Sequence, residues 1–347
     1  MVVLCLAAAC ANPIDDSTIT KHDFAGTSGD LAGADLTGAD LTGTTDDMPG
    51  VGDMSRIGWT DKTFTTTSTL WSVWGDGTTV WAVGDAGVLV KSMGGAAFAA
   101  DPATKPNTTT ALYSIFGVGS GPPGSPLLAA GAGGAIWSYS TTPAPNGAWS
   151  AVAGTGTQNF SFVWVAPDGQ AFAVGPANVA KKQNGATWDN IAGLDATAFG
   201  LWGVKTASGY TVYACGASGK IWKYTGTNFV AENTSVSTAL YGIYGFGEND
   251  IYAVGDVGVL LHSTGSGAWA KQTVPVTTSL NAVGGASSDE VYAVGDNGVV
   301  LHKYDASSTT WTREVLASPT ENRNLVGVWA NTAQVWVTGF NGAILTK

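Results

Sequence analysis

The sequence predicts an all-β fold, a closed β-propeller of seven blades with four strands in each blade. Three observations lead to this prediction. A phrase of thirteen residues recurs seven times along the 347-residue chain. Strand-like segments flank each copy, and the last copy lacks a segment that the chain provides before the first. The composition agrees, because 48 glycines, 14 tryptophans and 12% charged residues are typical of short strands joined by tight turns.

The recurring phrase predicts a hairpin in every blade. It is clearest as IYAVGDVGVLLHS from Ile251 and VYAVGDNGVVLHK from Val291. Apolar and small residues lie on both sides of a Gly-Asp-x-Gly centre, in which glycine allows positive φ and aspartate can bond to its own backbone. The phrase also carries an alanine, whose small side chain would let a neighbouring sheet approach. The shared glycines are 39 to 47 residues apart: Gly84, Gly131, Gly175, Gly216, Gly255, Gly295 and Gly339.

Two further strands complete each blade. The segment before each hairpin reads LWSVWG from Leu70, LYSIFG from Leu112 and LYGIYG from Leu240, with an aromatic residue near its end. The segment after each hairpin carries one aromatic residue. Six such residues follow their hairpins and the seventh, Trp59, precedes the first repeat: Phe98, Trp149, Trp188, Phe229, Trp269, Trp311 and Trp59.

This displacement predicts how the ring closes. The last repeat ends at Lys347 after its third strand, so the segment at Trp59 can supply the fourth. Pairing the two ends would remove an exposed sheet edge. A solenoid gives no reason to place one strand at the opposite end of the chain.

The repeats resemble two known families. The phrase x-V-x-A-V-G-x-x-G resembles the propellers of the photosystem II assembly and stability factor family. The segment GATW, Gly185 to Trp188, resembles the end of the Asp-box in neuraminidase-type repeats. The resemblance covers residues 56–347 and implies a propeller. It implies little about function, because such propellers serve as scaffolds, lectins and hydrolases.

Residues 1–10 form the first of three expected regions. The run MVVLCLAAA before Cys10 resembles the end of a bacterial lipoprotein signal peptide, in which the cysteine is lipidated. We expect an exported protein anchored through Cys10 in the outer membrane, facing the periplasm or the cell surface. Plain secretion, or an apolar stub without export, is the alternative.

Residues 11–55 form an acidic second region. They contain nine aspartates and one lysine, whereas the whole chain has a net charge of −11. The region is rich in Gly, Thr and Asp, and we expect a disordered linker. A period of five residues over Asp30, Asp35 and Asp40 leaves a pentapeptide coil as the alternative. The negative charge argues against nucleic acid as a partner.

The remaining residues, 56–347, show no catalytic constellation. The resemblance to sialidases implies three arginines from separate blades, but Arg313 and Arg323 share one connection and Arg56 adjoins the linker. His262 and His302 occupy equivalent positions, where Lys91 and Lys223 also occur, so we expect a solvated strand face; a chance metal pair is the alternative. Cys215 is predicted to be a buried small residue. No cofactor and no catalytic or metal-ligating residue is predicted.

Binding is the better-supported class of function. Asp85, Asp256 and Asp296 share one turn position, as turn formers or as part of a calcium or sugar site. With Glu321 and Arg323 they mark a candidate binding face, since the turns and the variable loops should lie together. We expect a membrane-tethered or secreted scaffold that binds a protein of the cell envelope. A glycan-binding lectin is the alternative, and a glycoside hydrolase is a second one.

Overall fold

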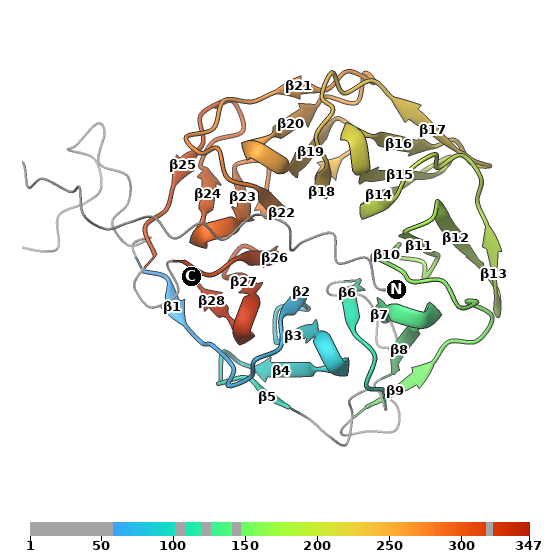
Figure 1. The fold of residues 1–347 in the computed structure, drawn as a ribbon, viewed down its shortest axis with the longest axis horizontal. Coiled ribbons are helices and arrows are strands. Elements are labelled where there is room, and N and C mark those ends of the chain that lie inside the picture. The colour runs from blue at the N-terminus through green and yellow to red at the C-terminus, as the bar shows by residue number, and fades with distance from the viewer. Residues whose placement is uncertain (1–57, 101–107, 119–125, 141–146, 317–321) are drawn as a thin grey trace, which may run out of the picture. The chain divides into compact units, whose positions relative to one another are not determined.

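The computed structural model describes residues 58–100, 108–118, 126–140, 147–316 and 322–347. It confirms the predicted fold, because seven sheets of four antiparallel strands are arranged in a ring (Figure 1). The helical elements within the described ranges are single 3-10 turns of three residues. In that part of the chain, no helix has the length and apolar character needed to cross a membrane.

Each blade begins with a strand near the axis and ends with one at the rim (Figure 1). The innermost strands are β2 (Leu70–Gly75), β6 (Leu112–Gly117), β10 (Phe162–Val165), β14 (Ala198–Thr206), β18 (Leu240–Gly247), β22 (Leu280–Ser287) and β26 (Leu325–Ala330). We number blades 1 to 7 in this order. The second strands are β3 (Thr79–Gly84), β7 (Leu127–Gly131), β11 (Ala171–Gly175), β15 (Gly209–Gly216), β19 (Asp250–Gly255), β23 (Glu290–Gly295) and β27 (Val335–Gly339).

The outer half of each blade is shorter. The third strands are β4 (Leu89–Met93), β8 (Ile136–Ser140), β12 (Val179–Asn184), β16 (Ile221–Tyr224), β20 (Leu260–Ser263), β24 (Val300–Lys303) and β28 (Ile344–Thr346). The rim strands are β5 (Ala99–Ala100), β9 (Ala148–Ala151), β13 (Thr187–Asn190), β17 (Phe229–Glu232), β21 (Ala270–Lys271), β25 (Thr312–Arg313) and, for blade 7, β1 (Thr60–Asp61).

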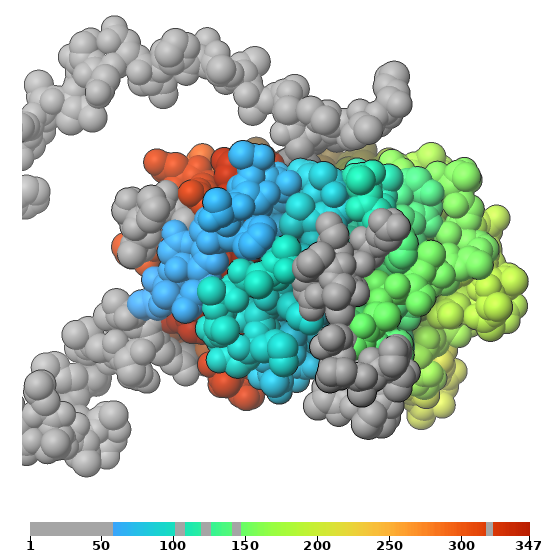
Figure 2. All heavy atoms as spheres, turned by 90° about the horizontal axis from the view of Figure 1, so that it is seen from below, coloured from blue at the N-terminus to red at the C-terminus, as the bar shows by residue number. Residues whose placement is uncertain are grey.

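The ring closes as the displaced segment predicts. In blade 7 the strand order is β1-β28-β27-β26, and Thr60 lies opposite Thr346. Figure 1 shows β1 at the outer edge of blade 7 beside β28, and in Figure 2 blue atoms from the start of the described chain adjoin red atoms from its end. All seven rim aromatics, Trp59 among them, are at most 9% exposed.

The hydrophobic core lies between neighbouring blades. The alanines of the hairpin phrase are fully buried there, as expected: Ala82, Ala129, Ala173, Ala214, Ala253 and Ala293. Four tryptophans of the inner strands each lie over a glycine of the next blade. If that glycine carried a Cβ, the Cβ would lie 3.1 Å or less from the nearest atom of the indole ring. These pairs are Trp329 over Gly75, Trp74 over Gly117, Trp164 over Gly203 and Trp202 over Gly245.

The recurring glycines are explained by close approach of the backbone. Gly84 is extended, with φ −163°, but a Cβ there would lie 2.1 Å from the carbonyl oxygen of Thr69. Positive φ is instead needed later in the turn, where Gly87 has φ 68°. Thus the two glycines of the phrase have different roles, and only the second one has the positive φ that the sequence pattern predicts.

Candidate functional site around the propeller axis

The hairpin turns and the loops that enter the blades lie on one face. The backbone N–H of Asp85 donates to the carbonyl of Thr69, just before β2, at 3.1 Å. Asp256 and Asp296 make the same bond to Ala239 and Ser279, each at 3.0 Å. The structure therefore brings the three predicted aspartates to one face, each beside the start of its blade's inner strand.

Two residues from each blade form a ring on this face, which we call the axial ring. One follows the first buried residue of the inner strand, and the other follows the recurring glycine. All are partly exposed. The axial ring consists of Trp71, Tyr113, Phe199, Tyr241, Asn281 and Val326 from the inner strands and Ser161 just before β10, with Asp85, Ala132, Pro176, Ala217, Asp256, Asp296 and Phe340 from the turns.

The three carboxylates accept bonds from the inner strands. Trp71 Nε1 donates to Asp85 at 2.7 Å and the Tyr241 hydroxyl donates to Asp256 at 2.9 Å. In blade 6, Asn281 Nδ2 donates to Asp296 at 2.9 Å. The sequence pattern predicts bonds within the turn, but these side chains instead tie the turn to the strand beside it. All three donors are neutral, and the described residues provide no ion pair to any of the three carboxylates.

Aromatic rings form two arcs, one beside Asp85 and one beside Asp256. Trp71 contacts Tyr113 and Phe340, with ring centroids 6.2 Å and 5.8 Å apart. Phe199 contacts Tyr241 at 5.5 Å. Burial, with a smaller contribution from the charge of Asp85, raises the pKa of Tyr113. The sequence contains a pattern that indicates these residues, because an aromatic residue directly follows the leucine in LWSVWG, LYSIFG and LYGIYG.

The other predicted site residues divide into two groups. Arg323 lies on the same face, and its carbonyl accepts a bond from Gly298 N–H at 2.8 Å. Its guanidinium, however, extends to Thr63, with Nη1 3.4 Å from the hydroxyl oxygen.

Glu321 and Cys10 lie outside the described residues. A shallow hollow of about 420 Å³ lies on this face, lined in part by Thr278, Asn297 and Arg313.

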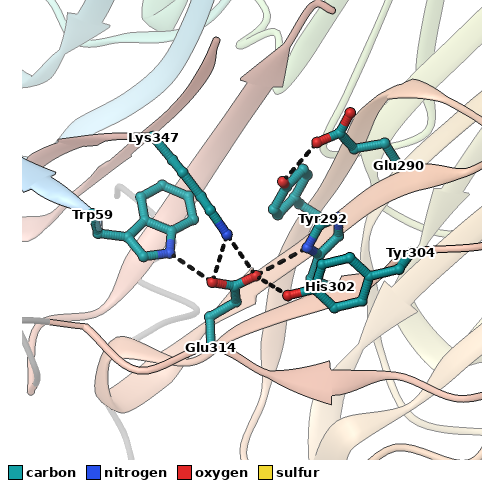
Figure 3. Close-up of polar contacts among 7 residues, drawn as sticks. All are labelled: Trp59, Glu290, Tyr292, His302, Tyr304, Glu314 and Lys347. Carbon is teal, nitrogen blue, oxygen red and sulfur yellow. Dashed lines mark hydrogen bonds and ion pairs between the residues drawn. The ribbon is translucent and has the colours of Figure 1, made fainter. Parts of the chain in front are cut away.

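A second polar cluster joins blade 6 to the closing strand (Figure 3). Glu314 is at its centre and accepts bonds from Trp59 Nε1 at 3.3 Å and from the Tyr304 hydroxyl at 2.7 Å. Lys347 Nζ lies 2.8 Å from one carboxylate oxygen, and His302 Nδ1 lies 2.9 Å from the other. Burial opposes ionisation of Glu314, but the bonds from His302, Lys347 and Tyr304 outweigh it and lower its pKa to about 2.

The expectation of a solvated histidine face is wrong for His302. Its side chain is fully buried, with its ring stacked on Tyr292 at a centroid distance of 3.9 Å. Burial lowers its pKa despite the neighbouring Glu314. His262, at the equivalent position of blade 5, is 25% exposed and binds Asp250 at 2.8 Å. In blade 6, Tyr304 lies with its ring centroid 3.7 Å from that of His302, and the closing segment adds Trp59 against Tyr292 and Lys347 against Glu314.

The remaining reactive groups have structural environments. Cys215 is fully buried, as expected, and burial raises the pKa of its thiol to about 12. Across the ranges that the structure describes, no three His, Cys, Asp or Glu side chains are grouped so as to hold a metal ion.

Solved propellers share this fold at low sequence identity. The WD40 β-propeller domain of Doa1 is 10% identical, with a TM-score of 0.69, over 83% of this chain and 96% of that one. YCF48 bound to D1 peptide is 15% identical, with a TM-score of 0.63, over 86% and 98%. YCF48 from Cyanidioschyzon merolae is 16% identical, with a TM-score of 0.62, over 83% and 98%.

These similarities establish the fold alone. No family model matches the chain. No curated protein matches it either. Membership of the families that the repeats resemble therefore stays a prediction.

Proposed function

We propose that the propeller is a non-catalytic interaction module that docks a partner protein on the face of the axial ring. The observation that carries this proposal is the ring itself. Five aromatic side chains and three carboxylates, all partly exposed, are held in place by bonds and ring contacts to the strands around the axis. Rigid strands that support a varied surface are the usual arrangement of a binding face.

The reactive groups elsewhere support a binding role over a catalytic one. His302 and Glu314 are used to join blade 6 to the closing strand, and Cys215 is buried among apolar neighbours. One solved propeller of this fold, YCF48, is bound to a peptide, the D1 peptide. By analogy, a peptide segment is the kind of partner that we propose for this chain.

The proposal includes a tether. Lipidation of Cys10 would hold the exported protein at the outer membrane, and residues 11–55 would extend the propeller from it. Metabolic labelling with a palmitate analogue tests this part. We expect label in the parent chain and none in Cys10→Ser, which should leave the membrane fraction. An unlabelled parent chain would leave plain secretion as the better account.

Partner capture tests the docking face. Asp256→Lys and Asp296→Lys reverse charges on it, and we expect both to reduce capture of a partner from native membranes, while melting temperatures show that the variants stay folded. Asp76→Lys and Asp305→Lys are the matched controls, at exposed positions in the β2–β3 and β24–β25 turns. Normal capture by the first pair, with loss in the second, would show that the partner binds elsewhere.

A lectin is the second candidate function. Partly exposed Trp71, Tyr113 and Tyr241 would suit stacking on sugar rings. A glycan array separates the two candidates, because a lectin should bind defined glycans and lose them in Trp71→Ala, whereas a protein-binding module should bind none.

A further inference from the structure

We infer that the axial ring recognises a cationic segment of its partner, in which arginine or lysine side chains approach the carboxylates across the aromatic rings. This inference rests on the proposed function and adds the chemistry of the segment that docks. It follows from the charge of the ring, from unused acceptors on its carboxylates and from the placement of its aromatic faces.

The aspartates of the ring have negative charge and no ion-pair partner among the described residues. Among its members are three aspartates and no lysine or arginine. On this face, Arg323 directs its guanidinium to Thr63, and Arg313, which lines the hollow beside Asn297, forms no ion pair with these aspartates. Within the described chain, the side chains that bond to the three carboxylates are neutral donors. A cationic partner group would meet complementary charge here.

Two carboxylates have an unused acceptor. The bonds to Asp256 come from Tyr241 and Ser279, and both end on Oδ1. The bond to Asp296 comes from Asn281 and also ends on Oδ1. In the described chain the Oδ2 atoms of both residues accept no hydrogen bond. Since blades 5 and 6 are neighbours, these two acceptors lie on adjacent blades, within reach of one cationic segment.

The aromatic residues supply the second part of the recognition. Trp71, Tyr113 and Phe340 form one contiguous arc beside Asp85, and Phe199 with Tyr241 forms another beside Asp256. Aromatic faces attract cations, and guanidinium groups stack on them readily. A ring that places carboxylates next to partly exposed aromatic side chains therefore favours arginine or lysine over a neutral or acidic segment.

Titration of the full chain with short peptides tests the inference. The probes are an arginine–glycine peptide and glutamine–glycine and glutamate–glycine peptides of the same length, measured by calorimetry at low and physiological salt. We expect only the arginine peptide to bind. The variant Asp85→Asn, Asp256→Asn and Asp296→Asn should weaken it about tenfold or more, because bonds to charged groups are lost. Asparagine keeps an acceptor for Trp71 and Tyr241, so the turns should stay folded.

A matched variant controls for general attraction to an acidic chain. Asp76→Asn, Asp189→Asn and Asp305→Asn remove the same charge from exposed positions outside the axial ring, and binding should stay within about twofold of the parent. Phe340→Leu keeps an apolar side chain but removes a ring face, and should weaken binding several-fold. Melting temperatures of all variants confirm that they are folded.

Four outcomes would overturn the inference: no binding of the arginine peptide, equal weakening in both triple variants, binding of the glutamate peptide, or unchanged binding in the axial variant. Its failure is distinguishable from failure of the proposed function. If the arginine peptide does not bind, but Phe340→Leu abolishes partner capture, the docking face stands and the cationic chemistry is wrong. If partner capture survives every change in the axial ring, the docking face itself is wrong.

Discussion

Glu314 illustrates how one buried side chain joins distant parts of this chain. It follows β25 in blade 6, yet it binds Trp59 of the closing segment and Lys347 beyond β28. Its side chain is 9% exposed and that of Lys347 is 10% exposed. A buried carboxylate is costly unless its lone pairs are used, and here Trp59, His302, Tyr304 and Lys347 use them.

Removing this charge should destabilise the propeller strongly. Glu314→Gln keeps the shape of the side chain but leaves the ammonium of Lys347 without its counter-ion. We expect the free energy of unfolding, measured in urea, to fall by about 3 kcal/mol. Glu232→Gln is the matched control, because Glu232 accepts a bond from Trp269 Nε1 at 2.8 Å but has no ion pair in the described chain. Glu232→Gln should lower the free energy of unfolding by about 1 kcal/mol. Equal losses would contradict a special role for the buried pair.

The same cluster should make stability depend on pH in a defined direction. His302 has a pKa lowered from 6.5, so the unfolded chain binds the proton first and stability falls as pH drops below 6.5. Glu314 has a pKa lowered from 4.5 to about 2, so its contribution is complete above 4.5 and is lost between these values. Both groups therefore favour the folded state at neutral pH.

Thermal melting between pH 7 and pH 5 isolates the histidine. We expect the melting temperature of the parent chain to fall over this interval, and the fall to be smaller in His302→Gln. The equivalent change in blade 5, His262→Gln, serves as the control and should leave the parent's pH dependence largely intact. A parent chain whose melting temperature is constant over the interval would count against the buried, neutral imidazole.

At the scale of elements, the blades pack through pairs of a large and a small residue. Trp202 of β14 lies over Gly245 of β18, and a Cβ at Gly245 would lie 2.8 Å from the indole and 2.9 Å from the carbonyl of Asp250. Between blades 2 and 3 the size difference is smaller, because Phe116 replaces the tryptophan and packs against a cluster that contains Val163 and Val165. The volume at each junction is thus shared between two neighbouring inner strands.

A single methyl group tests this packing. Gly245→Ala should lower the free energy of unfolding by about 1–3 kcal/mol, because a rigid ring and a backbone carbonyl cannot both move away. Gly247→Ala in the same strand is the matched control, since a Cβ there would meet nothing within 4 Å. Its effect should stay within about 0.5 kcal/mol. If Gly245→Ala is equally silent in urea denaturation, the tryptophan does not confine this junction.

Sequence reasoning could predict these elements because each repeat carries its own local pattern. The recurring glycines, alanines and rim aromatics all keep the positions that the pattern predicts. The aromatic members of the axial ring are not predicted by the repeat, because their contacts cross between blades, as in Trp71 against Phe340, and join residues far apart in the sequence. The repeat pattern also does not predict the burial of His302, because that burial depends on a local cluster of Tyr292, Tyr304 and Glu314, which the closing segment completes through Trp59 and Lys347.

At the scale of the whole molecule, the closing strand determines whether the ring has a free edge. Pairing of β1 with β28 continues beyond both elements, because Lys62 N–H donates to Ile344 and Phe64 N–H donates to Gly342, at 2.8 Å and 3.0 Å. Closure therefore combines a backbone ladder, the buried indole of Trp59 and the contacts of Glu314. Sheet edges left open promote association between chains.

Deleting residues 58–66 should therefore both lower the stability of the propeller and cause chains to associate, whereas a side-chain change at Trp59 should only lower the stability. Trp59→Ala removes a buried ring but keeps the backbone ladder, so it should cost about 3–5 kcal/mol while the chain keeps its size in solution. The deletion removes the ladder as well. We expect it to lower the melting temperature further and, because β28 becomes an unpaired edge, to produce larger species in light scattering.

Phe98→Ala, at the equivalent rim position of blade 1, controls for the loss of a buried aromatic away from the closure. A deletion variant that melts within about a degree of the parent and keeps its size would show that the ring is held together without its closing strand.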